Sequence, residues 1–388
     1  MTGIIHKVVV ASDSFKGCLR SDQVAAAVAE GLQDALPGCD VVKLTVGDGG
    51  EGTMDALISA LGGKRVVLSV QDPLGRPVEA EYAILTDGSA VIEISKCSGL
   101  MLLSAQERNP LKTSTYGAGQ LIADALIRGC RRFLVCIGGS ATNDAGIGLL
   151  EALGYRFVDS AGAELNGCGE ALEKITDVDL SKVMPELAEA EFIVACDVSS
   201  PLYGPKGAAY VFAPQKGADA AMVEKLDRGL RHFADIMQKC TGLDVADMPG
   251  AGAAGGLGAA FKAFLNADLK KGADMVLDAV RFDEQIVGAD LVITGEGKID
   301  SQTMAGKLPA AVAERASAQN IPVIAICGSS DVDTLPLFRK IYPVSPESMP
   351  LHEAMDPETA GRNIKDTVYA CLIQILDSGL FQGFELKI

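Results

Sequence analysis

The sequence predicts an α/β protein of two domains: a parallel sheet formed by the N- and C-terminal segments, and a second, mixed-sheet α/β domain inserted between them. The first observation is length, because 388 residues are enough for two domains at roughly 150 residues each. The second is that short β-branched runs alternate with Ala-rich helical stretches at both ends of the chain, the pattern of βα units around a parallel sheet. The third is a central stretch in which strand-like segments follow one another with no helix between them.

The N-terminal segment predicts two βα units. Strands are expected at residues 4–11 and 40–46, and helices at residues 21–36 and 53–61. Ser21 is the expected N-cap of the first helix, and Pro37-Gly38 is its stop signal. The βα rhythm returns near the other end of the chain, with strands expected at residues 290–294 and 321–327. We therefore expect residues 1–65 and 285–388 to form one Rossmann- or flavodoxin-like domain.

The segment after residue 65 predicts antiparallel hairpins. Strand-like runs at residues 66–70, 79–85 and 90–94 are separated by the turn sequences Asp72-Pro73-Leu74-Gly75 and Asp87-Gly88, which suit tight connections. This change of rhythm indicates a second α/β domain, for which we expect residues 66–284. The active site is expected in the cleft between the two domains.

Composition excludes several classes of protein. The formal net charge is −17, which leaves no basic face for a nucleic acid backbone. No apolar run reaches membrane-spanning length and the first residues lack a signal-peptide core, so a cytoplasmic protein is expected. The ten cysteines include no CxxC pair, and the three histidines show no zinc-ligand spacing, which argues for reduced thiols and against a zinc site.

Acidic residues follow the predicted strands again and again. Asp13, Asp48, Asp197 and Glu296 come directly after apolar runs, and the run 134–137 leads into Gly138-Gly139-Ser140-Ala141-Thr142-Asn143-Asp144. A single acid in such a place is as well explained as a turn former or helix cap. Several of them with glycine alongside favour a polar ligand site, because ligands of open α/β sheets bind beyond the carboxyl ends of the strands.

The sequence Gly47-Asp48-Gly49-Gly50-Glu51-Gly52 matches the GxGxxG pattern of dinucleotide-binding proteins, with Asp72 at the distance of a ribose-binding acid. Charge argues against that interpretation, because Asp48 and Glu51 would stand beside a pyrophosphate without an adjacent cation to offset them. Two carboxylates in a glycine-rich loop are better suited to a hydrated Mg²⁺ or to polyol hydroxyl groups.

A second glycine-rich stretch, residues 250–258, opens an expected helix at residues 259–265. Free N–H groups at a helix start favour an anion site, while close packing of a Gly-Ala helix is the alternative. Lys16, Lys298 and Lys307 are the cations best placed to stabilise a phosphoryl group in transfer. For Lys206 and Lys216 an ordinary solvated surface position is expected.

Seven blocks of sequence, taken together, resemble the bacterial glycerate kinase family in order and over nearly the whole chain. The blocks are residues 11–16, 47–53, 138–144, 195–198 with 201–202, 214–218, 249–258 and 293–303. The resemblance implies two α/β domains and ATP-dependent phosphorylation of D-glycerate, with the 2-phosphate as product. It implies small-molecule partners, neither nucleic acid nor membrane, and leaves a homo-oligomer open. The alternatives are a glycerate 3-kinase, an NAD-dependent hydroxy-acid oxidoreductase, and a sugar-acid-binding regulator without turnover.

On this interpretation a carboxylate accepts the proton of the substrate hydroxyl group late in the transfer, and Asp197 is expected in that role, with Asp300 second. Lys16 and Lys298 are expected to offset charge on the transferred group, and Asp48 and Glu51 to hold Mg²⁺. The residues expected to bind glycerate are Asp13, Ser14, Ser140, Asn143 and Asp144. Those expected to bind the phosphates and nucleotide are Gly250, Gly252, Gly255, Gly256, Glu296 and Thr303.

Overall fold

A computed structural model describes residues 5–301, 303–346 and 348–378. The chain forms two compact units: one takes the residues up to Asp48, residues Asp55–Ala60 and the chain from Val276 onward, and the other takes Gly49–Met54 and Leu61–Met275. The predicted domain borders near residues 65 and 285 stay a prediction. Residue 4 of the first predicted strand and residue 302 of the last sequence block lie outside the described residues.

The first unit is built on a five-stranded sheet in which every neighbouring pair is parallel, in the order β13-β12-β11-β1-β2. The strands are β1 (Lys7–Ser12), β2 (Asp40–Thr45), β11 (Leu291–Ile299), β12 (Val323–Ser330) and β13 (Lys340–Pro343). β1 lies between β2, its neighbour in sequence, and β11, which comes almost 300 residues later. The expectation of a parallel sheet formed from both ends of the chain is confirmed.

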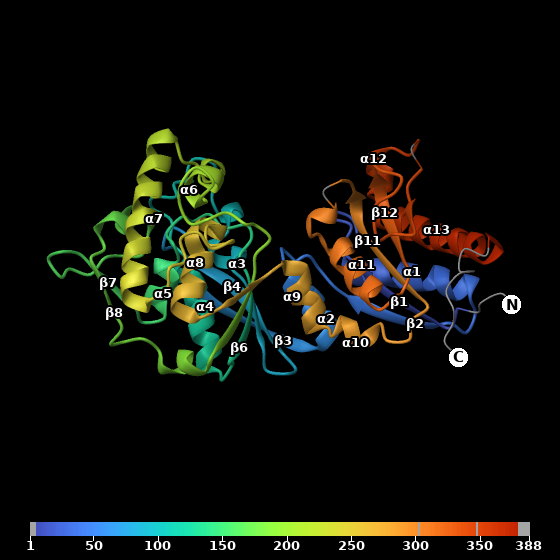
Figure 1. Ribbon diagram of the computed structural model, residues 1–388, viewed down its shortest axis with the longest axis horizontal. Coiled ribbons are helices and arrows are strands. Elements are labelled where there is room, and N and C mark those ends of the chain that lie inside the picture. Colours follow the sequence, from blue (N-terminus) through green and yellow to red (C-terminus); the bar gives the residue numbers. More distant parts are fainter. Residues whose placement is uncertain (1–4, 302, 347, 379–388) are drawn as a thin grey trace. The chain divides into compact units, whose positions relative to one another are not determined.

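Two long helices cover one face of this sheet. Helix α1 (Ser21–Ala35) and helix α13 (Pro357–Ser378) lie side by side (Figure 1), and their apolar residues share one core with those of β1, β11 and β12. A Cβ atom at Gly31 of α1 would lie 2.5 Å from the carbonyl oxygen of Lys365 of α13, so the close contact of the helices depends on that glycine. Helix α11 (Leu308–Ala318) packs against β11. The other helices of this part of the chain are α2 (Thr53–Leu61), α9 (Gly272–Ala279), α10 (Phe282–Gln285), η5 (Thr303–Ala305) and α12 (Leu351–Ala354).

The second unit is built on a six-stranded mixed sheet in the order β10-β9-β6-β5-β4-β3. β3 (Gly63–Gln71), β4 (Pro77–Leu85) and β5 (Ala90–Glu93) pair antiparallel, which confirms the predicted hairpins. β5, β6 (Arg132–Cys136), β9 (Glu191–Ala195) and β10 (Asp268–Lys270) pair parallel. A separate two-stranded sheet joins β7 (Arg156–Val158) and β8 (Asp177–Asp179).

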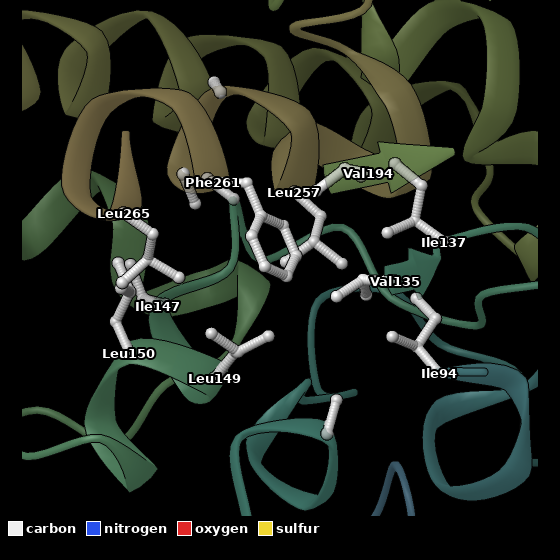
Figure 2. Packing of buried hydrophobic residues seen from close by; sticks show 14 of the residues in the cluster. Ile94, Val135, Ile137, Ile147, Leu149, Leu150, Val194, Leu257, Phe261 and Leu265 are labelled. Carbon is white, nitrogen blue, oxygen red and sulfur yellow. The ribbon is translucent and has the colours of Figure 1, made fainter. Parts of the chain in front are cut away.

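The core of the second unit is formed between its sheet and its helices. Figure 2 shows Leu257, Phe261 and Leu265 of α8 (Ala253–Leu265) pointing toward side chains of β6 and of α5 (Ile147–Ala152). Burying one such side chain contributes roughly 1.5–3 kcal/mol, so α8 is fixed against the sheet by its apolar face. The remaining helices are α3 (Ser95–Ser98), η1 (Leu100–Leu102), α4 (Tyr116–Ile127), η2 (Gly169–Lys174), η3 (Pro185–Glu189), α6 (Ala208–Phe212), η4 (Pro214–Lys216) and α7 (Ala220–Thr241).

Two details differ from the sequence-based expectations. Ser21 is the first residue of α1 rather than its N-cap, and its hydroxyl group donates a hydrogen bond to the carbonyl oxygen of Ser12. Strand β11 does not end before Glu296 but continues to Ile299, because β12 keeps pairing with it in parallel register.

The structure also describes the cysteines and the apolar content of the helices. The ten cysteines are all free thiols, and six of them are buried. Among the described residues, no helix is both long and apolar enough to cross a membrane.

Candidate functional site

Three acids meet at the carboxyl edge of the parallel sheet in the first unit. Asp13 follows β1, Asp48 follows β2 by three residues, and Glu296 lies in the last part of β11. These three strands are neighbours in the sheet. The backbone N–H of Asp13 donates to the carbonyl oxygen of Gly295 at 2.9 Å, which ties the end of β1 to β11. Neighbouring strands therefore bring together acids that are far apart in the sequence.

Asp13 is a buried acid of this edge with a strongly raised pKa. Its side chain is 7% exposed, and burial together with the nearby charge of Asp48 raises its pKa to about 7. A hydrogen bond from the backbone N–H of Ser14 at 2.7 Å and the charge of Lys16 work in the opposite direction. Asp13 therefore changes its charge near neutral pH, which is unusual for a carboxyl group and typical of functional sites.

Lys16 supplies the positive charge of the cluster. Its Nζ atom lies 2.7 Å from Oδ2 of Asp48, and the lysine side chain is largely exposed. Burial lowers the pKa of Lys16, but the hydrogen bond to Asp48 and the charges of Asp48, Asp13 and Glu296 outweigh it and raise the pKa. Lys16 therefore stays protonated, beside three acids.

Glu296 is held by its own group of partners. Its Oε1 atom accepts a hydrogen bond from Oγ1 of Thr303 at 2.7 Å, and its Oε2 atom lies 3.2 Å from Nζ of Lys307. Lys307 also lies 3.7 Å from Oδ1 of Asp300, so Glu296, Thr303 and Asp300 lie close together. Lys298 is exposed and pairs with Asp331 at 2.8 Å.

The two predicted metal ligands are described in separate units, Asp48 in the first and Glu51 in the second, where Glu51 is exposed. Among the described residues, no group of three or more His, Cys, Asp or Glu side chains is arranged to hold a metal ion. Mg²⁺ is commonly held by one or two carboxylates together with phosphate oxygens and water. The pair Asp13 and Asp48 fits that kind of site, because like charges raise the pKa of Asp13 and a cation would relieve them.

In the second unit, the residues after β6 form a tightly fixed segment, which we call the β6 loop (residues 138–144). Asp144 anchors one end: its carboxylate oxygens accept hydrogen bonds from N and Oγ1 of Thr115 and from N of Gly146 and Gly148. The side chain is fully buried, and burial raises its pKa despite these bonds. Asp144 therefore holds the loop in place, and its expected role in binding substrate stays a prediction.

Ser140 and Asn143, both expected to bind glycerate, are brought together by this loop. Ser140 is 6% exposed and Asn143 is inaccessible to solvent. Neither Oδ1 nor Nδ2 of Asn143 has a hydrogen-bond partner within the described part of the chain. Buried carboxamide atoms nearly always have partners, so Asn143 is the strongest sign of a ligand in this unit.

The expectation of a solvated Lys216 is wrong, whereas Lys206 is exposed as expected. Lys216 is 2% exposed, and its Nζ atom lies 2.8 Å from Oγ of Ser140 and 2.6 Å from the carbonyl oxygen of Thr142. Burial lowers the pKa of Lys216 to about 7, against a smaller opposing effect of the charge on Asp144. A Pro-Gln-Lys-Gly turn gives no sequence signal for a buried ammonium group.

Asp197, the expected proton acceptor, follows β9 as predicted. It is exposed, and its Oδ1 atom accepts a hydrogen bond from the backbone N–H of Gly272 at 2.9 Å. That bond orients the carboxylate while the side chain stays accessible.

The sequence analysis did not single out Glu93, at the end of β5. This residue is buried, and its Oε1 atom accepts a hydrogen bond from the backbone N–H of Met54 at 2.8 Å. Its position as an acid inside the apolar run 90–94 was the sequence signal that could have identified it.

The glycines of residues 250–258 are accounted for by packing within the protein. A Cβ atom at Gly255 would lie 2.2 Å from the carbonyl oxygen of Thr142, and one at Gly252 would lie 2.2 Å from that of Pro201. One at Gly250 would lie 2.7 Å from Sγ of Cys196, and Gly256 is closely packed as well. The N–H groups of Gly252 and Gly256 donate to protein carbonyl oxygens. The alternative of close packing is therefore favoured here over a phosphate cradle.

Asp72 does not resemble a ribose-binding acid. It is buried, and it accepts hydrogen bonds from the backbone N–H groups of Leu74 and Arg76 and from Nε of Arg76 at 2.6 Å. Its oxygens organise the turn between β3 and β4, which accounts for the residue without a cofactor.

Known proteins similar to this chain point to one family. The glycerate kinase family model matches residues 8–376. The chain is 45% identical to the glycerate kinase of Bacillus subtilis, over 90% of this chain and 93% of that protein. It is also 45% identical to the glycerate 2-kinase of Escherichia coli, over 83% of this chain and 85% of that protein. A crystal structure of a putative glycerate kinase 2 from Salmonella typhimurium matches with a TM-score of 0.89 and 41% identity, covering 97% of this chain and 99% of that one. The chain belongs to the glycerate kinase family.

Proposed function

We propose that this protein transfers the γ-phosphoryl group of ATP to the 2-hydroxyl group of D-glycerate. Membership of the family carries the kinase activity, and the relative named glycerate 2-kinase, 45% identical over 83% of this chain, supports the position of transfer. The carboxylate and lysine cluster at the end of the parallel sheet supports a reaction in which a charged group is positioned and its charge offset. Free cysteines support a cytoplasmic enzyme.

We assign the metal and phosphate chemistry to the acids and lysines of the first unit. Asp13 and Asp48 would hold Mg²⁺, which neutralises charge on the nucleotide phosphates when bound. Lys16, 2.7 Å from Asp48, would offset the negative charge that builds up on the transferred group. Glu296 would position Lys307, with Thr303 as its second partner.

We assign the acceptor to residues of the second unit. Ser140 and Asn143 would bind the hydroxyl groups and carboxylate of glycerate. Asp197 would accept the proton of the attacking hydroxyl group, because its carboxylate is accessible and oriented by the N–H of Gly272. Asp300 is the weaker choice, since it lies beside Thr303 and Lys307. The meeting of the two groups of residues at one active site stays a prediction.

The proposal is tested by incubating the purified protein with ATP, Mg²⁺ and D-glycerate and resolving the phosphoglycerate isomers by ³¹P NMR. A 2-phosphoglycerate signal is expected. A 3-phosphoglycerate signal would support the kinase activity but refute transfer to the 2-hydroxyl group. ATP consumption only with another hydroxy acid would overturn the acceptor, and ligand binding without any turnover would leave a binding protein.

A further inference from the structure

The ammonium group of Lys216 is buried without a carboxylate as hydrogen-bond partner. Its two acceptors are a hydroxyl oxygen and a carbonyl oxygen, those of Ser140 and Thr142. The nearest acid that acts on it, Asp144, already accepts hydrogen bonds from Thr115, Gly146 and Gly148. Burying a charge without an ionic partner is costly, and the β6 loop would need no cation if its only task were to fold.

The β6 loop is already fixed without Lys216. The backbone N–H of Ala141 donates to the carbonyl oxygen of Ser98 at 2.8 Å, and Oγ1 of Thr113 donates to that of Ala141 at 2.9 Å. Beyond the loop, the N–H of Ala145 donates to the carbonyl oxygen of Gly255 at 3.0 Å. These contacts hold the middle of the loop and the residue that follows it, so the lysine adds a positive charge to a segment that is otherwise well anchored.

The same loop carries side-chain atoms that lack partners among the described residues. They are both polar atoms of Asn143 and the hydroxyl oxygen of Thr142, all buried. A carboxamide can donate to a carboxylate and accept from a hydroxyl group, and an ammonium group neutralises a carboxylate. A small hydroxy acid offers both kinds of group, whereas a neutral polyol would leave the charge of Lys216 without a partner.

We propose that Lys216 is a positioning and specificity residue for the acceptor: it holds Ser140 and Thr142, thereby sets the orientation of Asn143, and its buried positive charge makes the β6 loop selective for an acid. The inference rests on the proposed function, because it takes the acceptor to be glycerate. Since Asn143 is closed to solvent in a loop anchored by hydrogen bonds, the acceptor reaches its carboxamide only when some of those bonds open, and binding of the acid alone is expected to alter the exchange of loop amides.

The first test is steady-state kinetics of Lys216→Met, with Lys206→Met as the matched control, since Lys206 is an exposed lysine on the neighbouring turn. We expect the KM for glycerate to rise by about 100-fold, the usual size of effect when one partner of a buried charge pair is removed. The KM for ATP should change less than about threefold, and Lys216→Arg should recover part of the loss because it keeps the charge. Lys206→Met should match the wild type. A glycerate KM within threefold of wild type, or equal losses for both substrates, would overturn the proposal.

A second measurement needs no variant and so remains decisive if Lys216→Met does not fold. Hydrogen exchange of the wild-type protein is followed with D-glycerate alone, with ATP alone, and with glycerol. Glycerate should change exchange in peptides covering residues 138–144 and 214–218, while ATP and glycerol should not. No change with glycerate in a protein that does phosphorylate it would refute the role of Lys216. If the NMR assay finds another hydroxy acid as acceptor, the same experiment with that acid tests Lys216 separately from the identity of the substrate.

Discussion

Replacing Lys216 by methionine should remove a pH dependence of stability that is built into the wild-type protein. In the folded protein without a bound acid, the pKa of Lys216 falls from its ordinary value of 10.5 to about 7 because the ammonium group is buried. Between these two values the unfolded chain binds more protons than the folded one, so the contribution of Lys216 to stability becomes more favourable as the pH rises. Below pH 7 both states are protonated, and the full penalty of burying the charge applies.

The magnitude follows from the two pKa values. The shift corresponds to a penalty of about 5 kcal/mol at pH 6 and about 2 kcal/mol at pH 9, at 1.36 kcal/mol for each pKa unit. The wild type should therefore gain roughly 2.5 kcal/mol relative to Lys216→Met between pH 6 and pH 9. The difference between the two proteins is the useful quantity, because the titration of other groups, Asp144 included, is present in both.

The assay is chemical denaturation of wild type, Lys216→Met and Lys206→Met at pH 6, 7, 8 and 9, with the transition of the second unit followed. A protein of two compact units need not unfold in one step, so a probe confined to residues 61–275 is required. The free energy of unfolding of Lys206→Met should change with pH in the same way as that of the wild type across the whole range. If the free energy of unfolding of Lys216→Met follows the same pH dependence, the buried ammonium group does not titrate between pH 6 and pH 9, and the lowered pKa of Lys216 is refuted.

Three further variants follow from the described contacts. Asp13→Asn should raise the melting temperature by several degrees at pH 8 while it lowers activity. The reason is that an ionised Asp13 with a pKa of about 7 costs the folded state about 4 kcal/mol at that pH. If calorimetry finds no stabilisation, the burial of the Asp13 carboxylate is contradicted. Asp197→Asn should lower kcat by at least about 100-fold with little change in either KM, and a wild-type kcat would remove Asp197 from the mechanism. Gly255→Ala should cost about 3 kcal/mol or more, since φ is +76° and the new Cβ atom would lie 2.2 Å from the carbonyl oxygen of Thr142. Gly204→Ala, with φ at +88° and no atom within 4 Å, is its matched control and should cost about 1 kcal/mol in urea titrations.

The parts of the fold that depend on local chemistry could be predicted from the sequence. Apolar β-branched runs bounded by Gly and Asp marked the strands, and the turn at Asp72 marked the β3–β4 hairpin. Acids after the strands marked one edge of the sheet, because parallel strands bring their carboxyl ends to the same edge. That reasoning placed Asp13 and Asp48 in one group of strand-end acids, although it paired Asp48 with Glu51 as the metal ligands.

The parts that depend on distant packing could not be predicted. The extension of β11 past Gly295 is set by its register with β12, in which Lys298 pairs with Ser329, whereas the sequence predicted a strand that ends before Glu296. The burial of Lys216 is set by Ser140 and Thr142, more than 70 residues earlier in the chain. For the glycines of residues 250–258, the sequence could not tell a helix start open to a ligand from one covered by the β6 loop.

The position of β1 between β2 and β11 also governs how the protein is made. The hydroxyl group of Thr294 in β11 bonds to the carbonyl oxygen of Ala11 in β1, 283 residues away in the chain. At a synthesis rate of about 5–20 residues per second, β1 waits on the order of 15–55 seconds for that neighbour to leave the ribosome. All six strands of the other large sheet emerge during this interval. The second unit is therefore expected to fold first during translation, while the β1–β2 pair keeps an open strand edge that chaperones can bind.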